Sequence, residues 1–198
     1  MSRKLIALFL CLTLALSAAA LADKSVIRVT DMFGREITLA EPATRIVVLT
    51  ASDCEILCAL GCEDAIVGRG QYCDYPASIL DVPVVLSGAE MNIEEVLALE
   101  PQVIVMGDMA HTREQVAMLE RSGVKVVISN ANDIEGTYTA IRMIGTLMGR
   151  DAEAEALIAE MQSVFAQIAA NSPWPAGPFT LRSRPCSGAC GRPATTPS

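Results

Sequence analysis

The sequence predicts an α/β fold: a three-layer lobe built on a parallel sheet and followed by a long bridging helix. Two expected strands, Arg45–Thr50 and Gln102–Met106, are almost continuous runs of β-branched and aliphatic residues. Such runs are typical of parallel strands that are covered on both faces. Expected strands also alternate with expected helices, which favours right-handed crossovers. The bridging helix is the Ala- and Glu-rich segment from Asp151 to about Ala170.

The first expected element is a β-hairpin with Gly34 in its turn, and its two strands are Val26–Val29 and Glu36–Leu39. After the strand Arg45–Thr50 comes a helix, Ser52–Leu60. Ser52 or Asp53 can cap the start of this helix, and Gly61 is placed to end it. No internal repeat is visible in the chain.

The rest of the lobe continues the alternation of strands and helices. The expected strands are Ala65–Gly68, Val82–Leu86, Gln102–Met106 and Val124–Ser129, and the expected helices are Ile93–Leu99, Thr112–Ser122 and Asp133–Met148. Asn92 can cap the first of these helices and Pro101 marks its stop. Gly123 and Gly149 are placed to end the other two.

Composition restricts the class of protein. The chain has 198 residues, a net charge of -8 and a pI near 4.7, and no basic patch that would suit nucleic acid. Met1–Lys4 is basic, Leu5–Ala19 is apolar and too short for a comfortable membrane span, and an A-x-A site follows. Residues 1–22 are therefore expected to be a secretory signal that is cut before Asp23. A lipid anchor at Cys11 is the alternative.

Chemistry-bearing motifs are few. Cys54, Cys58 and Cys62 are spaced by four residues, which suits a metal site or a reactive thiol but equally suits small core residues. We favour the core interpretation and expect no metal and no cofactor. Gly68-Arg69-Gly70 lacks the third glycine of a dinucleotide fingerprint, and a single histidine leaves little general-base chemistry. An enzyme is therefore not expected.

Several stretches together resemble one family. TASDCEILCALG, GRGQYCDYP, NIEEVLALEPQVIVMG and LERSGVKVVIS occur in the order found in the N-terminal lobe of periplasmic substrate-binding proteins of ABC importers for cobalamin and ferric siderophores. The likeness spans about Val26 to Gln162. It implies two α/β lobes joined by one long helix, a ligand held between them, and docking on a membrane permease. Tryptophans that cobalamin binders place near Gly88 and Gly107 are missing, so a corrinoid, a siderophore and haem all stay open.

Candidate ligand residues lie in loops that should follow the carboxyl ends of the strands, where α/β sheets bind ligands. They are Tyr72, Asp74, Tyr75, Glu90, Met109 and His111. A tyrosine offers a flat apolar face and a hydroxyl to a large ring-bearing ligand. The resemblance assigns ligand contact to Tyr72 in particular.

Other roles are open for several of these candidates. Tyr75 can instead pack under Pro76, and Asp74 can bond nearby backbone amides in a turn. The imidazole of His111 can bind iron or cobalt, or it can be an exposed residue just before a helix. Glu94 suits the positive end of a helix dipole, and the resemblance makes it the glutamate that docks on permease arginines.

The chain changes character near its C-terminus, where apolar periodicity stops after about Pro178. One interpretation is a disordered tail. Another is a frameshift, because synonymous codons for Leu181–Arg192 permit EIAPLQWGLWT in another frame, which is typical of the strand that opens the family's second lobe. The expected divisions are a signal at 1–22, a binding lobe at 23–150, an interlobe helix at 151–171 and an aberrant tail at 172–198.

We expect a periplasmic or cell-surface substrate-binding component of a metal-chelate importer, truncated and monomeric, with a chelate and an ABC permease as partners and no nucleic acid. The alternatives are a non-functional frameshifted remnant, an exported α/β enzyme of unknown reaction, and a chelate-sensing module that pairs with a receptor.

Overall fold

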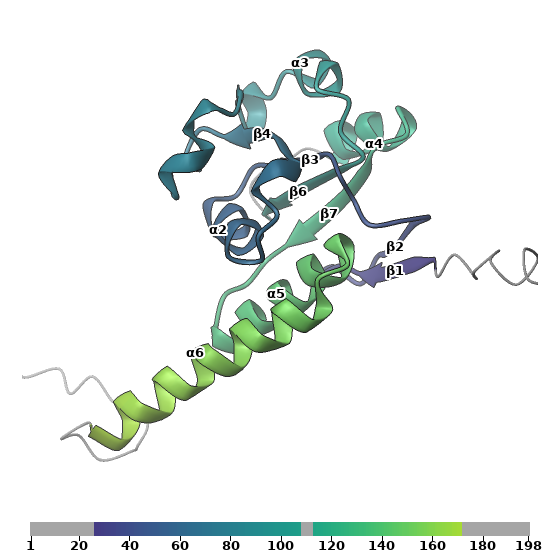
Figure 1. Cartoon of the computed structure of the whole chain (residues 1–198). Coiled ribbons are helices and arrows are strands. Elements are labelled where there is room, and N and C mark those ends of the chain that lie inside the picture. The colour runs from purple at the N-terminus through teal and green to yellow at the C-terminus, as the bar shows by residue number, and fades with distance from the viewer. Residues whose placement is uncertain (1–25, 108–112, 172–198) are drawn as a thin grey trace, which may run out of the picture. The chain divides into compact units, whose positions relative to one another are not determined.

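The computed structural model describes residues 26–107 and 113–171 (Figure 1). The described strands are β1 (Ile27–Thr30), β2 (Glu36–Leu39), β3 (Ile46–Val48), β4 (Ile66–Gly70), β5 (Val84–Val85), β6 (Val103–Gly107) and β7 (Lys125–Ser129). The α-helices are α2 (Ala51–Ala59), α3 (Ile93–Ala98), α4 (Arg113–Arg121), α5 (Ile134–Met148) and α6 (Asp151–Asn171). Three short 3₁₀ turns were not expected from the sequence: η1 (Glu63–Ala65), η2 (Ala77–Asp81) and η3 (Gly88–Glu90).

A five-stranded parallel sheet forms the centre of the lobe, with the strand order β5-β4-β3-β6-β7. From β3 the chain builds outward to β4 and β5, then crosses back to β6 and continues to β7. The order therefore reverses between β3 and β6, which are hydrogen-bonded neighbours. This reversal is the topological switch point at which open α/β sheets bind ligands. The predicted parallel sheet is confirmed.

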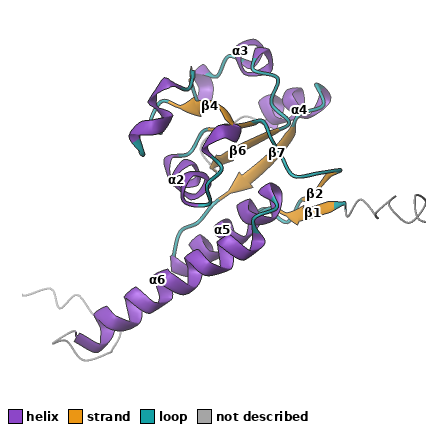
Figure 2. Cartoon of the chain, viewed as in Figure 1, coloured by secondary structure: helices purple, strands orange, loops and turns teal. Residues whose placement is uncertain are grey.

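Two hydrophobic clusters cover the two faces of this sheet, which gives the three layers that the sequence predicts. One cluster joins alternate residues of the central strands to α2 and α5, with Val48, Leu57 and Ile144 among its buried members. The other packs the opposite side chains against α3 and α4 through residues such as Val96 and Leu119. Figure 2 shows the helices on the two sides of the strands.

The long helix α6 is present where the sequence predicts it. Ala154 and Ile158 bury its first part against the lobe, and the Arg142 guanidinium donates to Glu155 Oε1 at 2.7 Å. Residues 163–171 belong to a second compact unit, in which Val164, Phe165 and Ile168 are exposed. No helix within the described ranges is long and apolar enough to cross a membrane.

The hairpin of β1 and β2 is a separate antiparallel sheet, as predicted, with Gly34 at φ 76° in its turn. Asp31 is buried there and accepts hydrogen bonds from the backbone amides of Phe33 and Arg35. It also accepts from the amide of Ile128 in β7 at 3.3 Å. One carboxylate therefore closes the turn and fastens the hairpin to the edge of the main sheet.

Most of the predicted helix ends are confirmed. Asn92 caps α3 by accepting from the amides of Glu94 and Glu95, and Gly149 ends α5 in the left-handed conformation. The predicted cap of α2 is wrong: its N-cap is Thr50, and no side chain caps it. Ser52 and Asp53 instead lie inside the first turn, where Asp53 is buried.

Two predicted segments lie outside the described residues: the signal at 1–22 and the tail at 172–198. They remain expectations, as do the predicted domain boundaries.

Candidate functional site

The carboxyl ends of the parallel strands carry the candidate site. At the switch point, β3 leads into Thr50 and β6 ends at Gly107. A Cβ atom on Gly107 would lie 3.2 Å from the Thr50 hydroxyl oxygen, so a side chain there would crowd the crevice. The glycine therefore allows the two strand ends to approach closely.

The loop after β4 carries the aromatic candidates. Tyr72 is 68% exposed and Tyr75 is 67% exposed, whereas Cys73 between them is buried. Tyr75 is therefore not the buried plug that the sequence left open as an alternative. Asp74 is exposed, and its side chain accepts no hydrogen bond from the described residues, so the expected turn-forming bonds are not seen. Two phenols and one carboxylate face solvent from the same short loop.

A buried arginine holds this loop from beneath. Arg69, the fourth residue of β4, is 9% exposed. Its guanidinium donates to the carbonyl oxygens of Cys73 at 2.9 Å, Leu80 at 3.1 Å and Val82 at 3.2 Å. These acceptors lie at the two ends of the loop, so one planar fork fixes both ends. The sequence analysis missed this role, although an arginine between two glycines of a buried strand is a signal that could have found it.

A second buried polar group lies at the switch point. Asp53 is 1% exposed, and within the described part of the chain its Oδ2 atom has no hydrogen-bond partner. Burial raises the pKa of this carboxyl to about 6, although the hydroxyls of Ser129 and Thr50 oppose the rise by hydrogen bonding. Because Ser129 ends β7 and Thr50 follows β3, Asp53 joins three elements below the carboxyl edge.

The cysteines of α2 support the core interpretation. Cys54 and Cys62 are buried and Cys58 is half-buried, and all of them pack in the cluster on the α5 side of the sheet. Within the described ranges, no group of three or more His, Cys, Asp or Glu side chains could hold a metal ion.

The remaining candidates are separated. Glu90 ends the η3 turn and is exposed, and Glu94 is exposed in the first turn of α3. The Gln115 side chain donates to the Gly88 carbonyl at 3.2 Å, which ties α4 to the η3 turn. Met109 and His111 lie outside the described residues.

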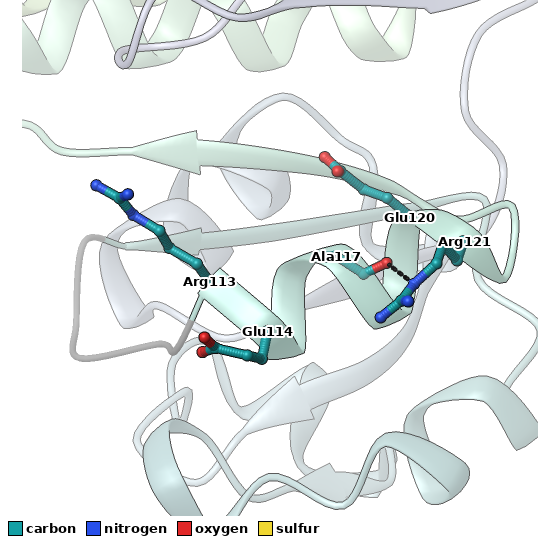
Figure 3. A pocket seen from close by; sticks show the side chains of 5 residues that line it. All are labelled: Arg113, Glu114, Ala117, Glu120 and Arg121. Atoms are coloured by element: carbon teal, nitrogen blue, oxygen red, sulfur yellow. Dashed lines mark hydrogen bonds between the residues drawn. The ribbon is translucent and has the colours of Figure 1, made fainter.

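A hollow of about 590 Å³ lies elsewhere, along one face of α4 (Figure 3). Its lining residues are Arg113, Glu114, Ala117, Glu120 and Arg121. All of these side chains except Ala117 are charged, and both signs are present. Glu120 is paired with Arg35 at 3.0 Å. Ligand sites for large organic molecules are mostly apolar and concave, so this open charged face is not a candidate for one.

The fold and the edge described above define an α/β lobe with a candidate ligand site at its topological switch point. The chain belongs to the periplasmic binding protein family, whose model matches residues 46–173. Membership of this family makes it an exported protein of the periplasm or cell surface, which confirms the resemblance and the predicted location.

Similar proteins carry names that agree with this class. An ABC transporter substrate-binding lipoprotein of Bacillus subtilis, YvrC, is 27% identical over 69% of this chain and 44% of its own length. A cobalamin-binding protein of Halobacterium salinarum is 31% identical over 70% of this chain and 38% of its own length. The crystal structure of a periplasmic haem-binding protein of Pseudomonas aeruginosa aligns with TM-score 0.61 and 26% identity, over 64% of this chain and 46% of that one. The chain thus spans less than half the length of these relatives.

Proposed function

We propose that this chain is the ligand-capturing component of an ABC importer for a metal chelate: cobalamin, a ferric siderophore or haem. The described lobe supplies one wall of the binding site, and no chemical step is performed. The observation that carries the proposal is the loop of Tyr72 and Tyr75, whose exposed phenols are held at the carboxyl edge by the buried Arg69. Rigid aromatic faces suit large, flat, ring-bearing ligands at low entropic cost.

The comparisons favour the chelate class. The Halobacterium relative is named for cobalamin and the Pseudomonas structure for haem. Both ligands are macrocycles that hold a metal, and both present a face on which a phenol can stack. Glu90, Met109 and His111 are further proposed contacts, and Asp74 would meet a polar group at the ligand's rim.

A purified sample of the chain tests the proposal directly. Cobinamide, haemin and a ferric siderophore are titrated separately, and the absorbance of the chelate reports binding. Tyr72→Ala should weaken binding of the preferred chelate by roughly tenfold, which corresponds to about 1.4 kcal/mol of lost aromatic contact. Met118→Ala is the control, because Met118 is a similarly exposed apolar side chain on α4. Equal affinities for the two variants would refute the role of Tyr72.

The alternative is that the chain has no binding function and is a non-functional remnant of a longer protein. The alignments cover 44% and 38% of the two relatives, so the described lobe corresponds to less than half of either one. A ligand clamped by one lobe loses about half of its burial, and its contacts must still offset the entropy of association. If no chelate binds at millimolar concentration, the remnant is the better description. Sequencing the locus tests the frameshift, which requires an intact second-lobe frame downstream.

The proposal includes one partner in the membrane. Glu94 would dock on arginines of the permease, because it is an exposed carboxylate at the start of α3. The loop of Tyr72 and Tyr75 would then not need to contact the permease when the ligand is delivered. The binding lobe would act as a monomer.

A further inference from the structure

The thioether of Met32 lies where the hairpin of β1 and β2 meets the end of β7. Its Sδ atom accepts a hydrogen bond from the backbone amide of Asn130 at 3.1 Å and a longer one from the Ser129 hydroxyl at 3.9 Å. The Met32 amide in turn donates to the carbonyl oxygen of Ile128 at 3.1 Å. One residue of the hairpin turn therefore contacts residues 128–130, which form the end of β7 and the start of the loop after it.

This contact lies beside the candidate site. Ser129 ends β7 and is paired in register with Gly107, which ends β6 at the switch point. A change that releases Ser129 and Asn130 from Met32 therefore acts on the carboxyl edge of the sheet as well as on the hairpin.

Burial divides the methionines of the described ranges into two groups. The buried ones are Met91, Met106, Met143 and Met148. Met118 is 48% exposed, and Met32 and Met161 are half-buried, so a small oxidant can reach these three. Among the three, Met32 alone has a sulfur that accepts hydrogen bonds from described residues. Oxidation at Met32 is therefore the one that changes a contact between two elements.

We propose that Met32 is a site of oxidation by hydrogen peroxide and that its sulfoxide releases the hairpin turn from the end of β7. A lone pair on Sδ attacks one oxygen of the peroxide, and the O–O bond breaks. The leaving hydroxide takes the proton of the transferred hydroxyl group and departs as water. The sulfur is oxidised by two electrons and the peroxide is reduced by two, so the products are the sulfoxide and water.

The sulfoxide cannot keep the contact that the thioether makes. The new S–O bond uses a lone pair and leaves the sulfur partly positive, so the sulfur no longer accepts from the Asn130 amide. A sulfoxide is also strongly polar, and Met32 packs against the hydrophobic cluster on the α5 side of the sheet, where a polar group costs free energy. Asp31 still accepts from the Ile128 amide, which limits the opening to the end of β7.

The test uses the full chain and needs no ligand, so it is independent of the proposed function. The protein is treated with hydrogen peroxide for increasing times and quenched with catalase, and its peptides are mapped by mass spectrometry. We expect the peptides of Met32 and Met118 each to gain one oxygen, while the peptide of the buried Met106 stays unmodified. The melting temperature should fall by about 5 °C as Met32 is oxidised, because two hydrogen bonds are lost. Hydrogen exchange should become faster in the peptide that contains Asn130.

Variants separate Met32 from the other oxidisable groups. Met32→Leu keeps a similar volume and cannot form a sulfoxide, so peroxide should not lower its melting temperature. Met118→Leu is the matched control and should show the wild-type loss. Since cysteines also react with peroxide, a loss in Met32→Leu as large as that of wild type would overturn the proposal. So would a Met32 peptide that stays unmodified when Met118 is fully oxidised.

The wild-type chain decides the matter even if the leucine variant fails to fold. Its loss of melting temperature should follow the oxidation of Met32 in time rather than that of Met118. Methionine sulfoxide reductase should reverse the loss. A loss that follows Met118, or one that persists after Met32 is reduced again, would show that the Met32 contact is not the cause.

Discussion

Arg69 Nη1 donates a 2.9 Å hydrogen bond to the backbone oxygen of Cys73, four residues ahead in the chain. The same guanidinium reaches Leu80 and Val82, so the buried charge is surrounded by carbonyl oxygens rather than by a carboxylate. This contact decides where Tyr72 and Tyr75 stand, since they flank Cys73. The exposed part of the candidate site therefore depends on a buried residue that is not itself one of the candidate ligand contacts.

Arg69→Met is expected to lower the free energy of unfolding by about 3 kcal/mol or more, because three carbonyl oxygens lose their donor in a buried place. Chemical denaturation measures the loss. Arg28→Met is the matched control: Arg28 pairs with Glu36 on the surface, and such pairs contribute about 0–1 kcal/mol. If the Arg69 variant is no less stable than the Arg28 variant, the hydrogen bonds of Arg69 do not stabilise the loop.

Asp53 makes stability depend on pH in a defined window. Its pKa is about 6 in the folded protein against an ordinary 3.8, so between these values the folded state holds a proton that the unfolded state lacks. The stability that this group contributes is complete below pH 3.8 and is lost as pH rises through 6. The loss amounts to about 3 kcal/mol.

Asp53→Asn should remove this slope and make the protein more stable than wild type at pH 7. Unfolding curves recorded from pH 3.5 to pH 7.5 give the comparison. Asp64→Asn, at an exposed position in η1, should keep the wild-type slope. Parallel curves for wild type and Asp53→Asn would show that the buried carboxyl does not titrate here.

Asp31→Ala should cost about 3 kcal/mol or more, because the buried carboxylate accepts from two backbone amides of its own turn, from the Arg35 side chain and from the amide of Ile128. Hydrogen exchange should also rise in both strands of the hairpin, since its tie to β7 is lost. Glu36→Ala removes a surface carboxylate from the same hairpin and should change stability little. The prediction fails if the two variants unfold at the same denaturant concentration.

Glu94→Gln should weaken the proposed docking on the permease by roughly fivefold and flatten its salt dependence, because one charged contact is lost. Binding of the chain to vesicles that carry the permease of the same importer measures the effect. Glu95→Gln is the matched control, as both residues are exposed in the first turn of α3 and both amides bond Asn92. If both variants lose the same affinity for the permease, the effect comes from the net charge of the helix end and not from Glu94 in particular.

Local patterns predicted the elements well because their causes are local. The apolar runs around Val47 and Ile104 form adjacent parallel strands. Asn92 starts α3 as its N-cap, and Gly149 ends α5 in the left-handed conformation, as their residue types favour. The strand ends shifted by at most two residues, and the strand Glu36–Leu39 did not shift. The N-cap of α2 was predicted wrongly because Ser52 and Asp53 are both residue types that cap helices. In the structure Thr50 is the N-cap, and Asp53 is buried inside the first turn.

The candidate site was only partly predictable. Tyr72, Tyr75 and Asp74 follow a strand, so their position at the carboxyl edge and their exposure could be expected from the pattern. The roles of Arg69 and Asp53 could not, because each depends on atoms from segments that the sequence does not place beside them.

The sequence by itself determined which segments are strands and helices, that the sheet is parallel, and which loops lie at its carboxyl edge. Those outcomes follow from propensity, apolar patterning and chain direction, which are properties of neighbouring residues. Tertiary structure alone decided that Asp53 is buried against Ser129, that Arg69 bonds the Leu80 carbonyl, and that Cys73 packs against Val48. These contacts depend on strand register and on how the loop folds back, and a shift of one residue would replace every one of them.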